Sequence, residues 1–244
     1  MEAWTAEAVI LDRRAHGESS AIVDFFTRDH GRYGGLVRGG NARRLKPALQ
    51  PGNMVQASWR ARLSEHLGSA TIDPGRAYAA EVLTDQVLLA GLSAMCALLK
   101  IVPERQAYPR LFDTVMVLLE ALENRQVWLP LFVRFELALL EEVGFGLDLS
   151  ACAATGTRDD LTHVSPRSGR AVSREAAEPY AERMFVLPAF LLSADAPADA
   201  DDVLQGLSLT GHFLERRVYG ADTSGLPAAR ERFVEILRIK GVPA

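Results

Sequence analysis

The chain has 244 residues, of which 48% are hydrophobic, and its formal net charge at pH 7 is −4. This length and apolar content exclude wholesale disorder and allow one large domain or two smaller ones. The longest apolar stretch, residues 87–102, falls short of the roughly 20 residues that a membrane-spanning helix needs. The two cysteines, Cys96 and Cys152, form no disulfide framework, which fits a reducing compartment. With no signal-peptide pattern at the N-terminus, we expect a soluble, cytoplasmic protein with no membrane association.

Charge is distributed unevenly along the chain. Residues 1–80 carry 11 Lys and Arg against 8 Asp and Glu, a net of +3, whereas residues 81–244 carry a net of −7. Between residues 28 and 62, eight cations face a single carboxylate, Asp29, with Tyr33, Trp59 and several glycines interleaved. A basic segment that carries aromatic residues is typical of polyanion-binding surfaces. The alternative interpretation is a solvated charged face.

The first 80 residues show strand patterns. Runs of β-branched, aromatic and other apolar residues predict strands at 7–11, 21–27, 33–37, 54–61 and 68–72. Gly31 is predicted to adopt positive φ in the turn between the second and third strands. Five short strands with Gly-rich turns predict a small barrel, and an SH3-like barrel fits the strand count as well as an OB-fold.

From residue 81 onward the apolar spacing changes to that of helices, which predicts an α+β chain with domains at 1–80 and 81–244. Helices are expected at 81–101, 108–124, 126–143 (ending at Gly144), 203–219 and 228–239, with a short one at 173–183 capped by Ser173. An irregular insertion is predicted at about 145–173. Residues 195–202 are predicted to form an acidic linker.

No catalytic constellation is present in the sequence. The five histidines are scattered without an HExxH pair, and neither a GxSxG nor a Walker A motif occurs. A structural zinc site usually needs CxxC pairs, but Thr155 stands three residues after Cys152 and no further cysteine follows. We therefore expect no enzyme activity, no metal and no cofactor.

Five pieces of the basic region follow one another in a recognisable order. They are Glu7 to Leu11, Gly17 to Val23, Phe26 to Arg32, Val37 to Gly40, and Leu49 to Gly52. This succession resembles the bacterial RecO family of recombination mediators. The resemblance implies an N-terminal OB-fold, a helical remainder, and a central loop that in the family often holds zinc on four cysteines. Only Cys152 matches that pattern here, so the loop is expected to be zinc-finger-like without the metal.

The resemblance also implies a function in DNA repair. RecO-like proteins bind single- and double-stranded DNA, anneal complementary strands, and act with RecR and the C-terminal tail of single-stranded-DNA-binding protein (SSB) to load recombinase onto coated strands. A nucleoid-associated location follows from this. Two alternatives stay open: an RNA-binding OB-fold protein, and a helical adaptor whose barrel binds another protein.

The residues themselves suggest where DNA would bind. Four cations, Arg38, Arg43, Arg44 and Lys46, stand in a Gly-flanked loop that could wrap a strand. Arg60 and Arg62 share one sheet face because alternate strand residues point the same way, and Trp59 then points to the core. Tyr33 is the better candidate for stacking on a base, and Arg28 and Arg32 are expected to serve the geometry of the turn as much as DNA.

A partner site is expected in the helical part. An acidic peptide that ends in an apolar residue needs an apolar groove rimmed by cations. The cations nearest long apolar helix faces are Lys100, Arg105, Arg110 and Arg134.

Overall fold

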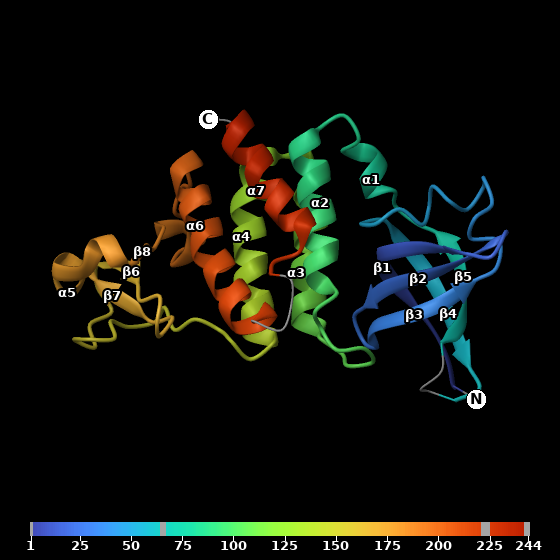
Figure 1. Ribbon diagram of the computed structural model, residues 1–244, viewed down its shortest axis with the longest axis horizontal. Helices are drawn as coiled ribbons and strands as arrows, with labels where there is room; N and C mark the ends of the chain where they lie inside the picture. Colours follow the sequence, from blue (N-terminus) through green and yellow to red (C-terminus); the bar gives the residue numbers. More distant parts are fainter. Residues whose placement is uncertain (1, 64–66, 221–224, 242–244) are drawn as a thin grey trace. The chain divides into compact units, whose positions relative to one another are not determined.

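The computed structural model describes residues 2–63, 67–220 and 225–241 (Figure 1). The chain divides into two compact units, Met1–Glu123 and Asn124–Ala244. The first unit holds a five-stranded barrel and three helices, so it extends well past residue 80. A domain boundary at residue 80 stays a prediction. No described helix is long and apolar enough to cross a membrane.

The barrel confirms the predicted α+β fold class with an OB-like N-terminal region. Its strands are β1 (Glu2–His16), β2 (Ser20–Thr27), β3 (Gly31–Val37), β4 (Met54–Ala61) and β5 (Gly68–Pro74). They close in the order β1-β2-β3-β5-β4, and β4 returns to β1. Among the described strand pairs of the barrel, β3 and β5 are parallel and the others are antiparallel.

Strand β1 is much longer than the predicted run at 7–11. Its first half pairs with β4, from Glu2 opposite Ala61 to Val9 opposite Met54. Its second half pairs with β2, and an irregularity in register falls between Ile10 and Asp12. One strand that bends between two partners is what closes the barrel.

The barrel core confirms the predicted orientation of the strand residues. Trp59 is 1% exposed while its neighbour Arg60 is exposed. Gly31 has φ +72°, as predicted, and a Cβ added to it would lie 1.7 Å from the backbone oxygen of Gln106. This turn therefore requires glycine both for its conformation and for space.

Three helices follow the barrel in the first unit: α1 (Tyr78–Glu81), α2 (Gln86–Leu99) and α3 (Pro109–Glu120), which ends in the 3-10 turn Ala121–Glu123. The prediction of one helix at 81–101 is wrong. The helix is interrupted between α1 and α2. A new helix begins after Asp85, because its side chain accepts hydrogen bonds from the amides of Val87 and Leu88. Cys96 of α2 is buried, and burial raises the pKa of its thiol to about 12.

The second unit contains α4 (Arg125–Glu142), α6 (Ala200–Phe213) and α7 (Ala228–Lys240). The predicted linker at 195–202 is wrong at its C-terminal end, because Asp199 and Asp202 form a capping box that begins α6. The predicted helix at 203–219 changes to a π-helical turn at Leu214–Tyr219. Gly144 follows α4 with φ +87°, consistent with its predicted role in ending that helix.

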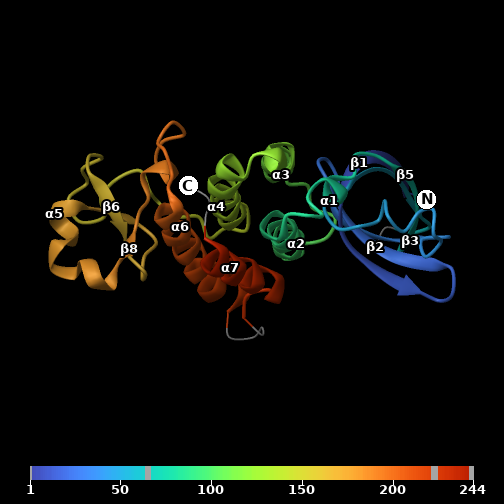
Figure 2. The same cartoon turned by 90° about the horizontal axis from the view of Figure 1, so that it is seen from above.

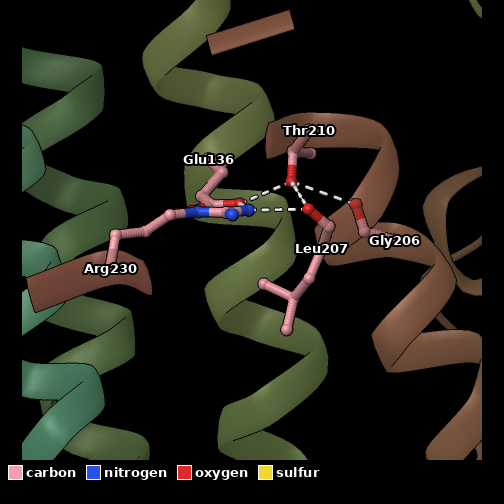
Figure 3. A network of polar contacts seen from close by, with 5 residues as sticks. All are labelled: Glu136, Gly206, Leu207, Thr210 and Arg230. Atoms are coloured by element: carbon pink, nitrogen blue, oxygen red, sulfur yellow. Dashed lines mark hydrogen bonds and ion pairs between the residues drawn. The ribbon is translucent and has the colours of Figure 1, made fainter. Parts of the chain in front are cut away.

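A buried ion pair links these three helices (Figure 3). Arg230 of α7 donates to Glu136 of α4 through Nε at 2.8 Å and Nη2 at 3.0 Å, and to the Leu207 carbonyl of α6 at 2.6 Å. Thr210 donates its hydroxyl to the same carboxylate. Glu136 and Arg230 are 0% and 5% exposed, and the pKa of Arg230 is raised, since the nearby carboxylate outweighs the effect of burial.

A small sheet has two of its strands in the segment predicted to be irregular, 145–173, and its third strand beyond that segment (Figure 2). Strands β6 (Leu161–Val164) and β7 (Ala171–Ser173) pair with each other, and β6 also pairs with β8 (Phe185–Val186). Three short helical pieces flank this sheet: α5 (Arg174–Ala177), the 3-10 helix Glu178–Arg183 and the 3-10 turn Ala189–Leu191.

Cys152 lies buried beside this sheet. Its Sγ accepts hydrogen bonds from the amide and hydroxyl of Ser173, at 3.3 and 3.4 Å. Ser173 precedes α5 as predicted, but its side chain makes no capping bond. Burial acts to raise the pKa of Cys152, yet hydrogen bonds from Ser173 and Thr155 outweigh it and lower the pKa to about 6. Within the described ranges no three His, Cys, Asp or Glu side chains gather as metal ligands, so this loop does not fit a zinc ion.

Candidate nucleic-acid interface

The loop that follows β3 presents three cations on a folded backbone. We call residues 41–50 the basic loop. Consecutive turns shape it, with hydrogen bonds from the Leu45 and Lys46 amides to the Ala42 carbonyl at 3.1 and 3.0 Å. Leu49 is fully buried and Leu45 packs against the barrel core. Because these leucines anchor the loop, Arg43, Arg44 and Lys46 remain on its exposed side.

The start of the basic loop is fixed to the barrel. A Cβ at Gly40 would lie 2.8 Å from the Cβ of Ala21, so the loop can leave the sheet this closely only with glycine. Arg13 of β1 donates through Nε to the Gly40 carbonyl at 3.2 Å and through Nη2 to the Asn41 side chain. The loop is thus held before any ligand arrives.

Strand order brings three further arginines together. Val37 of β3 lies opposite Ala70 of β5, and Arg60 of β4 lies opposite Ser69. Arg38, directly after β3, therefore approaches Arg60 across the central strand β5. These two and Arg62 line one hollow of about 630 Å³. We call Arg38, Arg60 and Arg62 the arginine cluster.

Smaller hollows connect the arginine cluster with its surroundings. One of about 150 Å³ is lined by Arg38, Arg60 and Leu45 of the basic loop. Another of about 360 Å³ is lined by Arg60 with Trp4 and Trp59. Arg60 contributes to all three hollows, and Leu45 lines one of them, so the basic loop adjoins the arginine cluster.

Cations of the basic segment fall into two groups by pairing. Arg28 binds Asp113 at 2.8 Å, and Arg32 binds Glu104 at 3.3 Å and the Val102 carbonyl at 2.9 Å. Ion pairs thus occupy these two cations, and their predicted role, in the geometry of the turn as much as in DNA binding, stays a prediction. Among the described residues, by contrast, no carboxylate pairs with the six cations of the basic loop and the arginine cluster, and all six are exposed.

Tyr33 does not offer the stacking face that its sequence context suggested. It is 6% exposed, and its ring meets those of Trp4 and Trp59 edge-on, with centroids 5.0 and 4.9 Å away. The Arg105 guanidinium lies 5.8 Å from the centroid of the Tyr33 ring, and burial raises the pKa of the Tyr33 hydroxyl. A stacking role for Tyr33 receives no support from this position.

Trp4 is the aromatic residue that sequence reasoning missed. It is partly buried, stacks on His30 at 4.3 Å, and pairs in register with Trp59 across β1 and β4. It lines a hollow together with Arg60. The signal was its place opposite Trp59, which becomes visible only once β1 is known to begin at Glu2.

The four predicted partner cations have different local surroundings. Lys100 binds Asp12 at 2.7 Å; although burial opposes it, this contact lowers the pKa of Asp12. In the second unit, Arg134 donates to the carbonyls of Phe190 and Ser193. Arg105 lies near Tyr33, and Arg110 is exposed at the start of α3.

Comparison with known proteins agrees with this arrangement. Residues 1–73 match the family model for the N-terminal part of recombination protein O, and residues 83–225 match the model for its C-terminal part. The chain is 49% identical to a DNA repair protein RecO of Rhodospirillum centenum over 96% of this chain and 94% of that protein. It is 49% identical to one of Cereibacter sphaeroides (97% and 99%) and 48% identical to one of Rhizobium etli (95% and 91%). The chain therefore belongs to the RecO family of DNA repair proteins, recombination mediators that are not enzymes.

Proposed function

We propose that this protein binds single- and double-stranded DNA through the basic loop and the arginine cluster, and anneals complementary single strands. The observation that carries the proposal is a set of six exposed cations, three in the basic loop and three in the arginine cluster, that have no carboxylate partner among the residues the structure describes. A phosphate that binds there displaces small counterions rather than an internal carboxylate, which makes binding favourable and dependent on salt.

Annealing follows from the kind of contact. Cations that contact phosphates neutralise two strands at once and lower their repulsion, while the base edges stay free to pair. The six side chains project from a fixed loop and from strand ends, so they track a backbone rather than enclose a base. Tyr33 is buried and adds little to this surface.

The proposal extends to partners and location. RecR and the SSB tail are the partners that help place recombinase on coated strands, and the protein acts in the cytoplasm at the nucleoid. Arg110 is the exposed helical cation best placed for a partner, while Lys100, Arg105 and Arg134 contribute only if their present contacts rearrange.

The test is the salt dependence of binding to a labelled oligo-dT of about 30 nucleotides, together with an annealing assay with and without SSB. Each lost phosphate contact lowers the slope of log affinity against log salt by about 0.7 for single strands, so R43A/R44A/K46A and R38A/R60A/R62A should each lower it by about 2. R158A/R167A/R183A, at exposed sites in the second unit, changes the net charge equally and should leave it unchanged. An unaltered slope in both site variants refutes the interface, and a preference for RNA of the same sequence favours an RNA-binding function.

A further inference from the structure

The hollow of about 630 Å³ beside the arginine cluster is lined by aliphatic side chains as well as by cations. Leu36 of β3 and Leu67, which directly precedes β5, contribute to it together with Ala61. Leu67 is 54% exposed. Of the described residues that line this hollow, none is acidic. Its volume falls in the range of about 300–1,000 Å³ that is typical of small-molecule sites.

The two leucines lie on one face of the sheet. Val37 points into the barrel core, so its neighbour Leu36 points outward, on the same face as Gly34. A Cβ added to Gly34 would lie 3.4 Å from Cδ1 of Leu67, so Leu67 lies beside the bare backbone of this glycine. Leu36 and Leu67 therefore form one aliphatic patch on the outer face of the barrel. We call them the aliphatic floor.

The aliphatic floor is supported from inside the barrel. Trp59, which is 1% exposed, donates its indole N–H to the Gly34 carbonyl of β3 at 3.1 Å. A Cβ added to Gly68 would lie 2.2 Å from a carbon of the same indole, so Trp59 packs directly against the backbone at the start of β5. One buried ring thus holds β3 and β5 together beneath the two leucines before any ligand binds.

The strand register places the aliphatic floor within one nucleotide's reach of the cations. Leu36 lies opposite Ser69, and Ser69 lies opposite Arg60. Two strand spacings, about 10 Å, therefore separate the backbone of Leu36 from that of Arg60. A long arginine side chain can hold a phosphate at this distance while the base next to that phosphate lies on the leucines.

This combination of groups selects the occupant. Three cations without a carboxylate partner among the described residues attract a polyanion, and an exposed aliphatic surface favours a ligand that also has an apolar face. A nucleotide of an unpaired strand has both parts. Leucine side chains contact base faces where proteins insert them between base steps, and arginine guanidinium planes stack on bases.

We propose that the aliphatic floor receives the face of an unpaired base and so gives single-stranded DNA an advantage over duplex DNA at this site. In a duplex each base is stacked and paired, and its removal costs free energy, whereas a single strand presents its bases at little cost. Contact with the face of a base leaves the pairing edge free, which is compatible with annealing. This inference rests on the proposed DNA binding through the arginine cluster.

The test compares labelled oligo-dT with an abasic oligonucleotide of the same length, which carries as many phosphates but no bases. Covering the exposed half of one leucine supports about a fivefold or larger preference of the wild type for oligo-dT. The dependence on salt should be the same for both ligands, since it reports phosphates alone. Leu67→Ser should remove most of the preference and leave the affinities for the abasic strand and for duplex DNA unchanged.

Two further variants separate the aliphatic contact from a general effect on folding. Leu67→Met keeps a flexible apolar side chain and should keep the preference. Val117→Ser on α3 is the matched control, because Val117 is 53% exposed, and it should change neither affinity. Thermal unfolding checks that each variant folds.

Equal affinity of the wild type for the two oligonucleotides would overturn this inference and leave the proposed phosphate binding standing. A Leu67→Ser variant that keeps the preference, or that loses both affinities in parallel, would also overturn it, because the base would then not lie on Leu67. If neither oligonucleotide binds the wild type, the proposed function fails and this inference fails with it.

Discussion

Replacing Glu136 with methionine, with Arg230 left in place, is expected to lower the free energy of unfolding of the second unit by about 3–5 kcal/mol. In the native protein the Arg230 guanidinium donates to both oxygens of Glu136 and to the Leu207 carbonyl. After the substitution only the carbonyl remains. A guanidinium that is 5% exposed would then be buried with its charge unpaired.

The reciprocal change, Arg230→Met, leaves the Glu136 carboxylate buried without its cation. The Thr210 hydroxyl would then still donate to one of its oxygens. It should cost about the same, 3–5 kcal/mol. The double variant E136M/R230M removes both charges and replaces them with apolar side chains. It should lie within about 2 kcal/mol of the wild type, because it leaves no unpaired ion.

Urea unfolding followed by hydrogen exchange of α4 peptides measures these effects in the right unit, since a chain of two compact units need not unfold in one transition. The matched control is the exposed pair of Arg174 and Asp160, whose side chains are 69% and 56% exposed and 3.0 Å apart. Asp160→Asn should cost about 1 kcal/mol or less. A double variant destabilised by the sum of the two single changes would refute the reasoning, because the pair would then not act as one unit.

Three further predictions concern Leu49, Gly31 and Cys152. Leu49→Ala should destabilise the first unit by about 2–5 kcal/mol in thermal unfolding and also weaken oligo-dT binding, since that fully buried side chain holds the basic loop; full DNA affinity would show that the loop needs no anchor. Gly31→Ala should cost at least about 1 kcal/mol in urea unfolding because the new Cβ meets the Gln106 carbonyl at positive φ, and a neutral result would contradict this turn geometry. Since the folded pKa of Cys152 is lowered to about 6, its contribution to stability is complete above the pKa of an unfolded thiol, about 8.5, and disappears as pH falls through 6. Ser173→Ala should therefore lower Tm more at pH 9 than below pH 6, and an equal loss at both would refute the thiolate.

Elements with a long, uniform pattern could be predicted from sequence. Strand β4 (Met54–Ala61) has the predicted bounds, and α4 (Arg125–Glu142) differs by one residue at each end. The predicted strand at 7–11 is shorter than β1, because the apolar run covers only the part of β1 where its pairing changes from β4 to β2. Strands β6, β7 and β8 have four, three and two residues, too few for a period to show.

The candidate nucleic-acid interface could likewise be predicted only in part. Local spacing predicted that Arg60 and Arg62 share a face, and both line one hollow. That Arg38 joins them depends on β5 lying between β3 and β4, a long-range pairing that no local pattern encodes. The hollow of about 800 Å³ beside the basic loop could not be predicted either, because part of its lining comes from residues around α1, before the interruption in what the sequence predicted as one helix.

Whether a cation of the basic segment is free to bind an anion depends on its ion pairs with carboxylates, and the fold determines these ion pairs. Arg28 and Arg38 are ten positions apart and look alike in sequence, yet Asp113, which neutralises Arg28, lies 85 residues further along the chain. Acidic residues from the net-negative part of the chain, 81–244, thus form ion pairs with cations of the barrel, including Arg28 and Arg32. Arg28 contacts α3, and Arg32 contacts the segment between α2 and α3. Within the described ranges the six cations of the basic loop and the arginine cluster meet no carboxylate, so an anion that binds them breaks no internal ion pair.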